Sequence, residues 1–395
     1  MKRWSRWWIG LLALSIACGE DADPPADASG RVDAGHDAGP LPEPAADYLS
    51  AGPYPVGNVH GTWIDASRES REIPVEIWYP AAESAREAAS AGQPMEAFER
   101  GANRDQLAAL IASAPSSCIR AQTRSADAPE PIAEPARWPI VVFSHCHACT
   151  RFDLAEVSER LASFGIAVVA PDHTGNALWD ELAGTAAPVG PDFLEVRVAD
   201  LRFVLDEVLD ETGSSVPERL RGRFDPERVG VMGHSFGAAT AGVAAARDPR
   251  IRAGLAIAAP ISALGGVRAN MLETPFGFVV AREDNSIREV GNTLMRREAE
   301  QLAGPSWRVE VRDAGHWSFS DHCGLIDLFM PGCGSGTRQT EPGVGFEYLD
   351  NAVARDVAAD VAAAFFARWL LGDVGATTAL VWPHSSGAIE LTYRP

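Results

Sequence analysis

Short apolar runs alternate with longer segments that carry apolar residues at helical spacing from Tyr48 onward. A short continuous apolar run is typical of a strand buried on both faces, and apolar residues three or four positions apart indicate an amphipathic helix. The alternation predicts an α/β domain with a mostly parallel central sheet flanked by helices. The expected strands lie near 59–64, 73–78, 140–143, 166–170, 229–232, 254–258, 276–280 and 307–311, and the clearest expected helices are 154–164, 194–209, 236–247, 288–302 and 356–371.

Two segments interrupt this alternation. Residues 81–137, rich in Ala, Ser and Pro, separate the second expected strand from the third and predict an insertion beside the sheet. Residues 317–348 follow the last of these strands and predict a long loop that contains cysteines. We therefore expect a single folded domain over residues 48–395 that carries both segments.

The composition supports one large domain. The chain has 395 residues, of which 46% are apolar, so it can bury a sizeable core. A small module and a wholly disordered chain are excluded. Acidic residues number 54 against 34 Lys and Arg, and the net charge of −20 opposes both nucleic acid and an anionic membrane surface. We therefore expect no nucleic-acid partner.

The N-terminal part differs from the rest of the chain. Basic residues precede the apolar run 7–17, which is too short to span a bilayer but has the size of a signal-peptide core. Residues 1–18 therefore predict a signal peptide. Its end, Leu-Ser-Ile-Ala-Cys at 14–18, resembles a bacterial lipobox with the Leu one position too early, so lipidation of Cys18 and ordinary cleavage nearby both stay open.

A tether is expected to follow the signal peptide. Residues 19–47 hold eight acidic residues against one Arg and almost no large apolar side chain, a composition that cannot form a core. We expect an exported protein, either secreted or held in the bacterial cell envelope. A lipid on Cys18 would be its contact with the membrane.

Gly233-His234-Ser235-Phe236-Gly237 lies between an expected strand and a helix of small residues. This order is the sequence form of a nucleophile elbow, a tight strand-to-helix turn that exposes a serine hydroxyl. The positions two residues either side of the serine must lack side-chain bulk, and both are glycine. A serine that merely caps a helix is the alternative. The flanking strand and helix favour Ser235 as a nucleophile.

The serine hydroxyl needs a base to take its proton, and in this architecture the chain order is serine, acid, histidine. Three histidines follow the serine: His316, His322 and His384. His316 comes directly after the last of these expected strands, where a loop would place it at the carboxyl edge of the sheet. His322 lies deeper in the cysteine-containing loop and His384 in a polar tail. We therefore assign the base to His316.

The acid must orient the imidazole and should leave the end of the preceding strand. The strand at 276–280 ends before Ala-Arg-Glu-Asp-Asn at 281–285. This favours Asp284, with Glu283 second. Asp313 is the third candidate, and its position before the histidine is more typical of a turn residue than of the catalytic acid.

An oxyanion hole needs the N–H of the residue after the nucleophile and a second N–H from a loop after an earlier strand. Phe236 supplies the first. The second loop follows the strand at 140–143, and within it we expect the backbone amide of His147. The side chain of His147 need not take part in the chemistry.

Other segments accompany the elbow: Pro-Ile-Val-Val-Phe-Ser-His at 139–145, Phe-Gly-Ile-Ala-Val-Val-Ala-Pro-Asp-His at 164–173, Gly-Pro-Tyr-Pro-Val-Gly at 52–57 and Ile-Trp-Tyr-Pro at 77–80. With them, residues 48–372 resemble the α/β-hydrolase superfamily. More narrowly, the chain is similar to platelet-activating-factor acetylhydrolases, dienelactone-hydrolase-like proteins and bacterial polyester hydrolases. The resemblance implies an α/β-hydrolase fold, a single catalytic domain, and cleavage of carboxylic esters by a Ser-His-Asp triad through an acyl-enzyme.

Two departures from this group affect the site. In the acetylhydrolases the acid ends the strand after the elbow helix, where this chain has Ala258. The acid is then expected from the next strand, as in the other two branches, which favours Asp284. The group's Ser-His-Gly becomes Ser-His-Cys at Cys146, and the added Cβ can alter the backbone that presents the amide of His147.

Five cysteines remain once the leader is set aside. Cys323 and Cys333 bracket a stretch with Gly and Pro soon after the expected base, and we predict a disulfide between them. Cys118, Cys146 and Cys149 leave two possibilities open, a bond that uses Cys118 or a local bond between the other two.

His145-Cys146-His147-Ala148-Cys149 contains the ligand types of a zinc site. It supports an alternative of another class, a metal- or ligand-binding lipoprotein that has kept the hydrolase fold. Four ligands within five residues cannot easily surround one tetrahedral ion, and no second cluster of matching spacing is visible. We therefore assign no metal site and expect no cofactor.

The substrate is expected to be a small-molecule or lipid-like ester. Apolar candidates for the pocket wall are Trp179, Phe193, Trp317 and Phe319, each of which could instead pack in the core. The segments 81–137, 179–193 and 322–348 would close over the site. The acyl chain and the alcohol depend on these loops.

Overall fold

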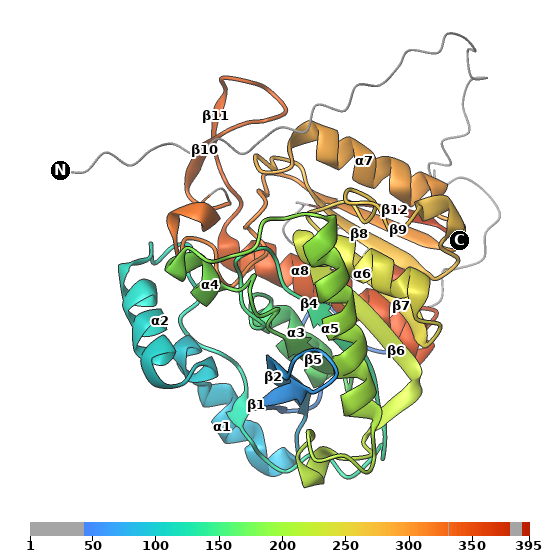
Figure 1. The fold of residues 1–395 in the computed structure, drawn as a ribbon. Coiled ribbons are helices and arrows are strands. Elements are labelled where there is room, and N and C mark those ends of the chain that lie inside the picture. The colour runs from blue at the N-terminus through green and yellow to red at the C-terminus, as the bar shows by residue number, and fades with distance from the viewer. Residues whose placement is uncertain (1–42, 331, 380–388) are drawn as a thin grey trace. The chain divides into compact units, whose positions relative to one another are not determined.

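The computed structural model describes residues 43–330, 332–379 and 389–395. The predicted signal peptide and most of the predicted tether lie outside these residues. Ten strands form one mixed sheet in the order β12-β9-β8-β7-β6-β4-β5-β2-β1-β3 (Figure 1). They are β1 (Val56–Asp65), β2 (Arg71–Pro80), β3 (Ala126–Asp127), β4 (Trp138–Ser144), β5 (Ala167–Pro171), β6 (Phe224–His234), β7 (Ile251–Ile257), β8 (Phe276–Ala281), β9 (Ser306–Val311) and β12 (Ile389–Arg394).

The six neighbouring strands from β5 through β4 and β6 to β9 run parallel, and antiparallel pairs flank them on both sides. Successive side chains of a strand point to opposite faces of the sheet. In β4, Val141 and Phe143 join the apolar cluster of one face, and Ile140 and Val142 join that of the other. Burial on both faces explains the continuous apolar runs in the sequence.

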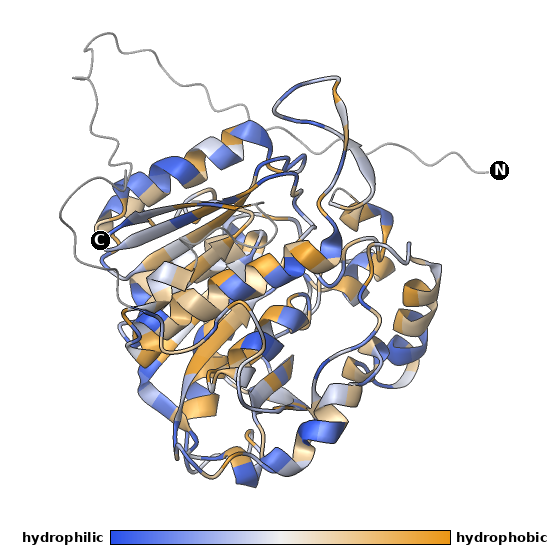
Figure 2. Cartoon of the chain, turned by 180° about the vertical axis from the view of Figure 1, so that it is seen from behind, coloured by the Kyte–Doolittle hydropathy of each residue, from blue (hydrophilic) through white to orange (hydrophobic). Residues whose placement is uncertain are grey.

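Helices cover both faces of the sheet (Figures 1 and 2). On one face α3 (Ala155–Ser163) packs against α8 (Asn351–Phe366), whose many alanines allow a close approach. On the other face lie α5 (Pro191–Leu209), α6 (Phe236–Arg247) and α7 (Arg288–Gln301). No helix among the described residues is both long and apolar enough to cross a bilayer.

All the expected strands and helices are present, and the sheet contains more than the pattern predicted. The segment 81–137 folds into α1 (Arg86–Ala91), α2 (Gly101–Ser113) and β3, which pairs with β1 and continues the sheet at that edge. At the opposite edge, β12 pairs antiparallel with β9. The cysteine-containing loop carries a small hairpin of β10 (Ser335–Thr337) and β11 (Gly345–Glu347). A short helix, α4 (Leu178–Ala183), precedes α5, and another, α9 (Ala376–Ala379), follows α8.

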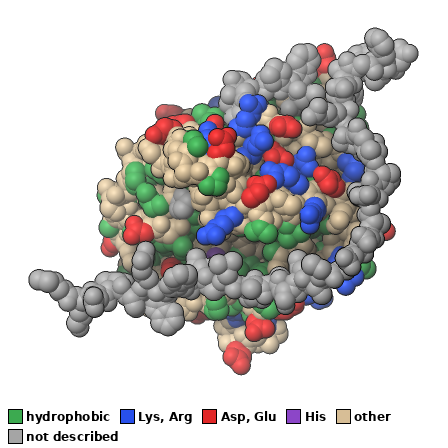
Figure 3. All heavy atoms as spheres, turned by 90° about the horizontal axis from the view of Figure 1, so that it is seen from above, with side chains coloured by type: hydrophobic (Ala, Val, Ile, Leu, Met, Phe, Trp, Pro, Cys, Tyr) green, Lys and Arg blue, Asp and Glu red, His purple; other side chains and the backbone are tan. Residues whose placement is uncertain are grey.

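Charged side chains of both signs are interspersed on the face drawn in Figure 3. On α7, for example, Arg296 pairs with Glu289 of the same helix and with Glu310 of β9. Mixed charges of this kind produce no strong field of a single sign that would steer a polyanion to this face.

The structure contains two disulfides among the described residues, Cys118–Cys333 and Cys146–Cys149. The predicted Cys323–Cys333 bridge is wrong. Cys333 folds back against the insertion, where its Cα lies 5.6 Å from that of Cys118. Cys323 is a buried free thiol. The long bridge therefore ties the insertion to the loop that follows β9.

Loss of this long bridge should destabilise the protein. Because its cysteines are 215 residues apart, the chain-entropy description gives a stabilisation on the order of 5 kcal/mol. We expect the double substitution Cys118→Ser and Cys333→Ser to lower the melting temperature, measured by calorimetry without reductant. Cys323→Ser, which removes a thiol but no bridge, is the control and should have a smaller effect. Equal melting temperatures for the double variant and the native chain would contradict the bridge.

Candidate active site

Ser235 stands between the end of β6 and the first residue of α6, as expected for an elbow. Its φ of 55° and ψ of −118° are strained for a residue with a side chain. A Cβ on Gly233 would lie 1.9 Å from the carbonyl oxygen of Gly237, and a Cβ on Gly237 would lie 1.8 Å from that of Ser144. Only glycine fits at these two positions, so the pair fixes the serine at the turn.

Three of the predicted site residues form one chain of hydrogen bonds. The Ser235 hydroxyl donates to His316 Nε2 over 2.8 Å, and His316 Nδ1 donates to Asp284 Oδ2 over 2.7 Å. The carboxylate is buried, and its other oxygen accepts the backbone N–H groups of Ser286 and Ile287, each at 2.9 Å. These bonds hold the carboxylate in place and with it the tautomer of His316 whose Nε2 is an acceptor.

The alternative acids face a different part of the molecule. Glu283 accepts hydrogen bonds from the side chain of Arg338 and from the backbone of Gln339. Asp313 also pairs with Arg338. Both carboxylates therefore help to hold the cysteine-containing loop. His384, an alternative base, lies outside the described residues.

The two predicted oxyanion donors are the backbone amides of Phe236 and His147. Within the described part of the chain, the backbone N–H groups of Phe236 and His147 donate no hydrogen bond. The close contact of Gly237 with Ser144 brings the first turn of α6 against the loop after β4. Both N–H groups therefore belong to segments that touch each other, and each has its hydrogen-bonding capacity unused.

Arg197 of α5 orients the loop that carries the His147 amide. Its guanidinium donates to the carbonyl oxygens of His145 and Cys146, at 2.5 and 3.0 Å. The C=O and N–H of a trans peptide point in opposite directions, so a Cys146 carbonyl held by Arg197 turns the His147 N–H to the other side. The guanidinium also stacks over the ring of Phe236, 4.3 Å from its centroid. Burial lowers the pKa of Arg197 to about 9.

A buried chain of polar groups leads from this arginine toward the surface. The ring of His173 joins the Ser144 hydroxyl, at 2.9 Å, to Asp200, at 3.0 Å, and Arg71 donates twice to Asp200. Burial, together with the nearby positive charge of Arg197, lowers the pKa of His173 to about 4. The ring is therefore neutral at pH 7, donates from Nδ1 and accepts from the Ser144 hydroxyl at Nε2.

His234, the residue before Ser235, links the elbow to the loop that carries His316. Its Nδ1 lies 2.8 Å from Asp153 Oδ2, and its Nε2 lies 3.0 Å from the carbonyl oxygen of His316. Both partners are acceptors, so both ring nitrogens carry a proton. Burial opposes the charge, but Asp153 outweighs it and raises the pKa of His234. The imidazolium thus ties His316 to the turn that holds Ser235.

The five-residue loop considered as a zinc site does not gather its own ligands. Cys146 and Cys149 are joined to each other. His145 accepts a hydrogen bond from the backbone of the loop after β5, and His147 accepts one from an amide side chain of the same loop. The two histidines are therefore committed elsewhere, and this loop alone forms no metal site.

The four predicted pocket residues have different surroundings. Trp317 is buried with its ring centroid 5.1 Å from that of His316, and Phe319 is 1% exposed in the core. Trp179 and Phe193 are partly buried against the apolar clusters of opposite faces. A cavity of about 510 Å³ beside α5 and the end of α6 is lined by none of these four residues and by no member of the hydrogen-bond chain. Trp317 thus lies beside His316, a member of that chain.

Comparison with known families identifies the branch to which this site belongs. The family described as “Platelet-activating factor acetylhydrolase, isoform II” matches residues 48–181 and 204–326, which include Ser235, Asp284 and His316. The chain belongs to this family. The predicted resemblance is therefore confirmed, and the segment 182–203, with Arg197, falls between the matched parts.

Relatives of this acetylhydrolase family are distant. A probable 1-alkyl-2-acetylglycerophosphocholine esterase of Arthroderma benhamiae is 26% identical over 208 residues, 48% of this chain and 50% of that protein. Platelet-activating factor acetylhydrolase of Bos taurus is 24% identical over 222 residues, 47% of this chain and 48% of that protein. The chain thus spans about half the length of these curated relatives.

A solved structure matches a larger share of this chain than these relatives do. The ferulic acid esterase from Streptomyces cinnamoneus superposes with a TM-score of 0.63 at 26% identity. The match covers 89% of this chain and 99% of that one. The predicted α/β-hydrolase fold is confirmed.

Sequence reasoning missed three buried residues around the site of this acetylhydrolase-family protein: Asp153, His234 and Arg197. His234 was visible in the elbow motif, next to the nucleophile. Arg197 lies three residues after Leu194 and four before Leu201, both on the apolar face of its helix. A charged residue within an apolar stripe was therefore the signal of a buried role. Asp153 had no local signal.

The buried neutral His173 should make stability depend on pH in one direction. Its folded pKa of about 4 lies below the ordinary 6.5, so below pH 6.5 the unfolded chain binds a proton that the folded chain does not. The contribution is present above pH 6.5 and is lost between pH 6.5 and 4, by roughly 3 kcal/mol. In urea unfolding, the native chain should lose this much stability relative to His173→Gln across that window. Parallel stability curves for the two proteins would show that His173 has no such role.

Proposed function

We propose that this chain is an exported serine hydrolase that cleaves carboxylic esters. The hydrogen-bond chain from Ser235 through His316 to Asp284 is the observation that carries the proposal, because it joins a nucleophile, a base and an orienting acid in that order. Such a triad can also serve peptide cleavage. Membership of an acetylhydrolase family favours esters.

Each group has a definite part in the proposed reaction. His316 Nε2 takes the hydroxyl proton of Ser235 as Oγ attacks the ester carbonyl, and Asp284 stabilises the imidazolium that forms. The backbone N–H groups of Phe236 and His147 bind the tetrahedral oxyanion. The imidazolium then protonates the leaving alcohol, and an acyl-enzyme remains. Water, deprotonated by the same imidazole, releases the acid and restores the serine.

The proposed substrate is a small-molecule or lipid-like ester. The names of the relatives include a platelet-activating factor acetylhydrolase and a 1-alkyl-2-acetylglycerophosphocholine esterase, and that of the structural neighbour a ferulic acid esterase. The chemistry shared by these names is an ester of a carboxylic acid. A panel of p-nitrophenyl esters with graded acyl chains, run beside a phospholipid ester and a polyester film, would separate these substrates.

Export is the part of the proposal that rests on the sequence of residues 1–18. Two disulfides among the described cysteines support it, because such bonds persist in oxidising compartments. We propose that Cys18 is either lipidated, which anchors the protein in the cell envelope, or removed with the signal peptide.

Removal of the nucleophile should abolish turnover. Ser235→Ala should lose nearly all hydrolysis of a short-chain p-nitrophenyl ester, together with labelling by a fluorophosphonate probe that requires an activated serine.

In the same assay Asp284→Asn should reduce kcat by about 10⁴-fold, because the His316 tautomer is no longer held. Glu283→Gln is the matched control, since this neighbour faces away from the base. Retained activity in Ser235→Ala would refute the mechanism, and the reverse order of the two acid variants would move the acid to Glu283.

Loss of the Arg197 fork should impair the chemical step. Arg197→Lys keeps the charge but loses the planar fork that holds two carbonyls, so the His147 amide should be misplaced. We expect kcat to fall by about 10- to 100-fold, with a smaller change in KM, because the oxyanion forms only in the transition state. Arg202→Lys, at an exposed position of the same helix, is the control. An unchanged kcat in a folded Arg197→Lys protein would remove this role.

A further inference from the structure

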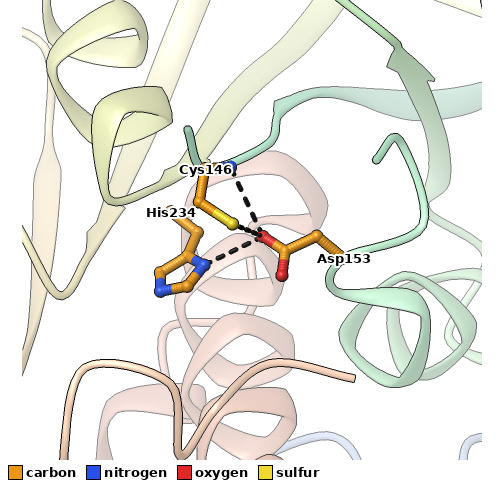
Figure 4. Close-up of side chains that lie close together, drawn as sticks. All are labelled: Cys146, Asp153 and His234. Atoms are coloured by element: carbon orange, nitrogen blue, oxygen red, sulfur yellow. Dashed lines mark hydrogen bonds and ion pairs between the residues drawn. The ribbon is translucent and has the colours of Figure 1, made fainter. Parts of the chain in front are cut away.

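A second group of buried side chains lies behind the nucleophile, with Asp153 at its centre. Cys146 Sγ and His234 Nδ1 approach the same carboxylate oxygen, at 3.1 and 2.8 Å (Figure 4). Cys149 and His322 form an overlapping group with Asp153, in which the sulfur, nitrogen and oxygen atoms all lie within 4.8 Å of one another. All five residues are at most 1% exposed. None of the five side chains belongs to the hydrogen-bond chain of Ser235, His316 and Asp284.

His322 presents an unused nitrogen to this group. Its Nε2 bonds with the Thr150 hydroxyl at 3.1 Å, whereas its buried Nδ1 has no hydrogen-bond partner in the described part of the chain. Nδ1 lies 3.9 Å from Asp153 Oδ1, too far for a hydrogen bond. The ring stacks on that of Phe329, which limits its rotation. A buried nitrogen without a partner is costly, and a ligand at this point would remove the cost.

The contact between Cys146 Sγ and Asp153 Oδ2 also favours a ligand in this group. In the disulfide neither atom carries a hydrogen, so two acceptors meet at 3.1 Å. A thiol on Cys146 would donate to this oxygen. A cation between a thiolate and the carboxylate would satisfy both atoms.

We propose that Cys146, Cys149, Asp153 and His322 form a zinc site that becomes available when the Cys146–Cys149 disulfide is reduced. Zinc takes four ligands of these types in a tetrahedron, at about 2.0 to 2.3 Å from the ion. Two thiolates and an imidazole favour Zn²⁺ over the harder Mg²⁺ and Ca²⁺. His234 keeps its hydrogen bond to the carboxylate and orients that ligand from outside the coordination sphere.

The donor set avoids the geometric objection to a site built from one loop. Cys146, Cys149 and Asp153 come from the connection between β4 and α3, and His322 comes from the loop after β9. His322 approaches from a second segment, and Asp153 lies outside the five-residue loop, so the donor set is not confined to that loop. The histidines between and beside the cysteines remain bonded to the loop after β5.

Opening the Cys146–Cys149 disulfide requires an external reductant. Two molecules of an external thiol supply two electrons and two protons. These break the Sγ–Sγ bond and leave two protein thiols, and the two external thiols become one disulfide. Zn²⁺ then displaces the two thiol protons and binds the thiolates. The disulfide and the metal use the same sulfur electron pairs, so the oxidised protein cannot form the site.

Zinc binding by the full-length protein tests the proposal. The protein is treated with a water-soluble phosphine, which supplies the two electrons and becomes its oxide with oxygen from water. Thiols are counted, and Zn²⁺ is titrated under nitrogen. We expect one Zn²⁺ per reduced chain and none per oxidised chain, with the Cys118→Ser and Cys333→Ser double variant behaving in the same way. A bridge that stays intact in reductant, or a reduced chain that binds no Zn²⁺, overturns the proposal.

Substitutions identify the ligands. His322→Ala should weaken Zn²⁺ binding by about 100-fold or more, because it removes the nitrogen that completes the tetrahedron. Two controls should bind as the native chain does: His147→Ala, which alters the histidine between the cysteines, and Cys323→Ser, which removes the other buried thiol. Loss of binding in His147→Ala with binding retained in His322→Ala would assign the metal to the loop alone and refute this site.

Discussion

The contact of Gly237 with the carbonyl of Ser144 sets the spacing of the whole site. It brings the first turn of α6 against the loop after β4, two segments whose strands are neighbours in the sheet. Ser235 and the Phe236 amide lie on one side of this contact, and the His147 amide belongs to the other. A side chain at Gly237 would push the turn that holds Ser235 away from the loop that carries the His147 amide, so the close approach of these two segments requires glycine at residue 237.

Buried arginines hold the remaining loops around that contact. Arg151 donates to Glu99 of the insertion and to Asp172 of the loop after β5. Arg120 of the insertion pairs with Glu159 of α3. The desolvation of buried charges offsets much of their attraction, so such pairs add little net stability. Their contribution here is geometric, since each one ties the insertion to another part of the domain.

The local features of the site could be predicted, and its long-range contacts could not. Strand ends, glycine spacing and chain order singled out Ser235, His316 and Asp284, which the structure joins by hydrogen bonds, because each follows a strand within a few residues. The Cys118–Cys333 bridge joins residues 215 apart, and nothing near either cysteine indicates the other. The expectation for Cys323 relied on nearness in sequence, whereas the loop turns that thiol into the core. β12 carries a weak pattern because an edge strand is only half buried.

The loop accommodates Cys146, where the resemblance implies a glycine, because the turn of the loop lies elsewhere. Cys146 has a negative φ, and the residue in the left-handed region is Ala148, at 59°. Ala148 sits inside the ring closed by the bond to Cys149, and its N–H donates to the carbonyl of Asn176 over 3.2 Å. With the Cys146 carbonyl held by Arg197, the loop is fixed by its partners on both sides. The orientation of the His147 amide thus depends on a disulfide and a buried arginine.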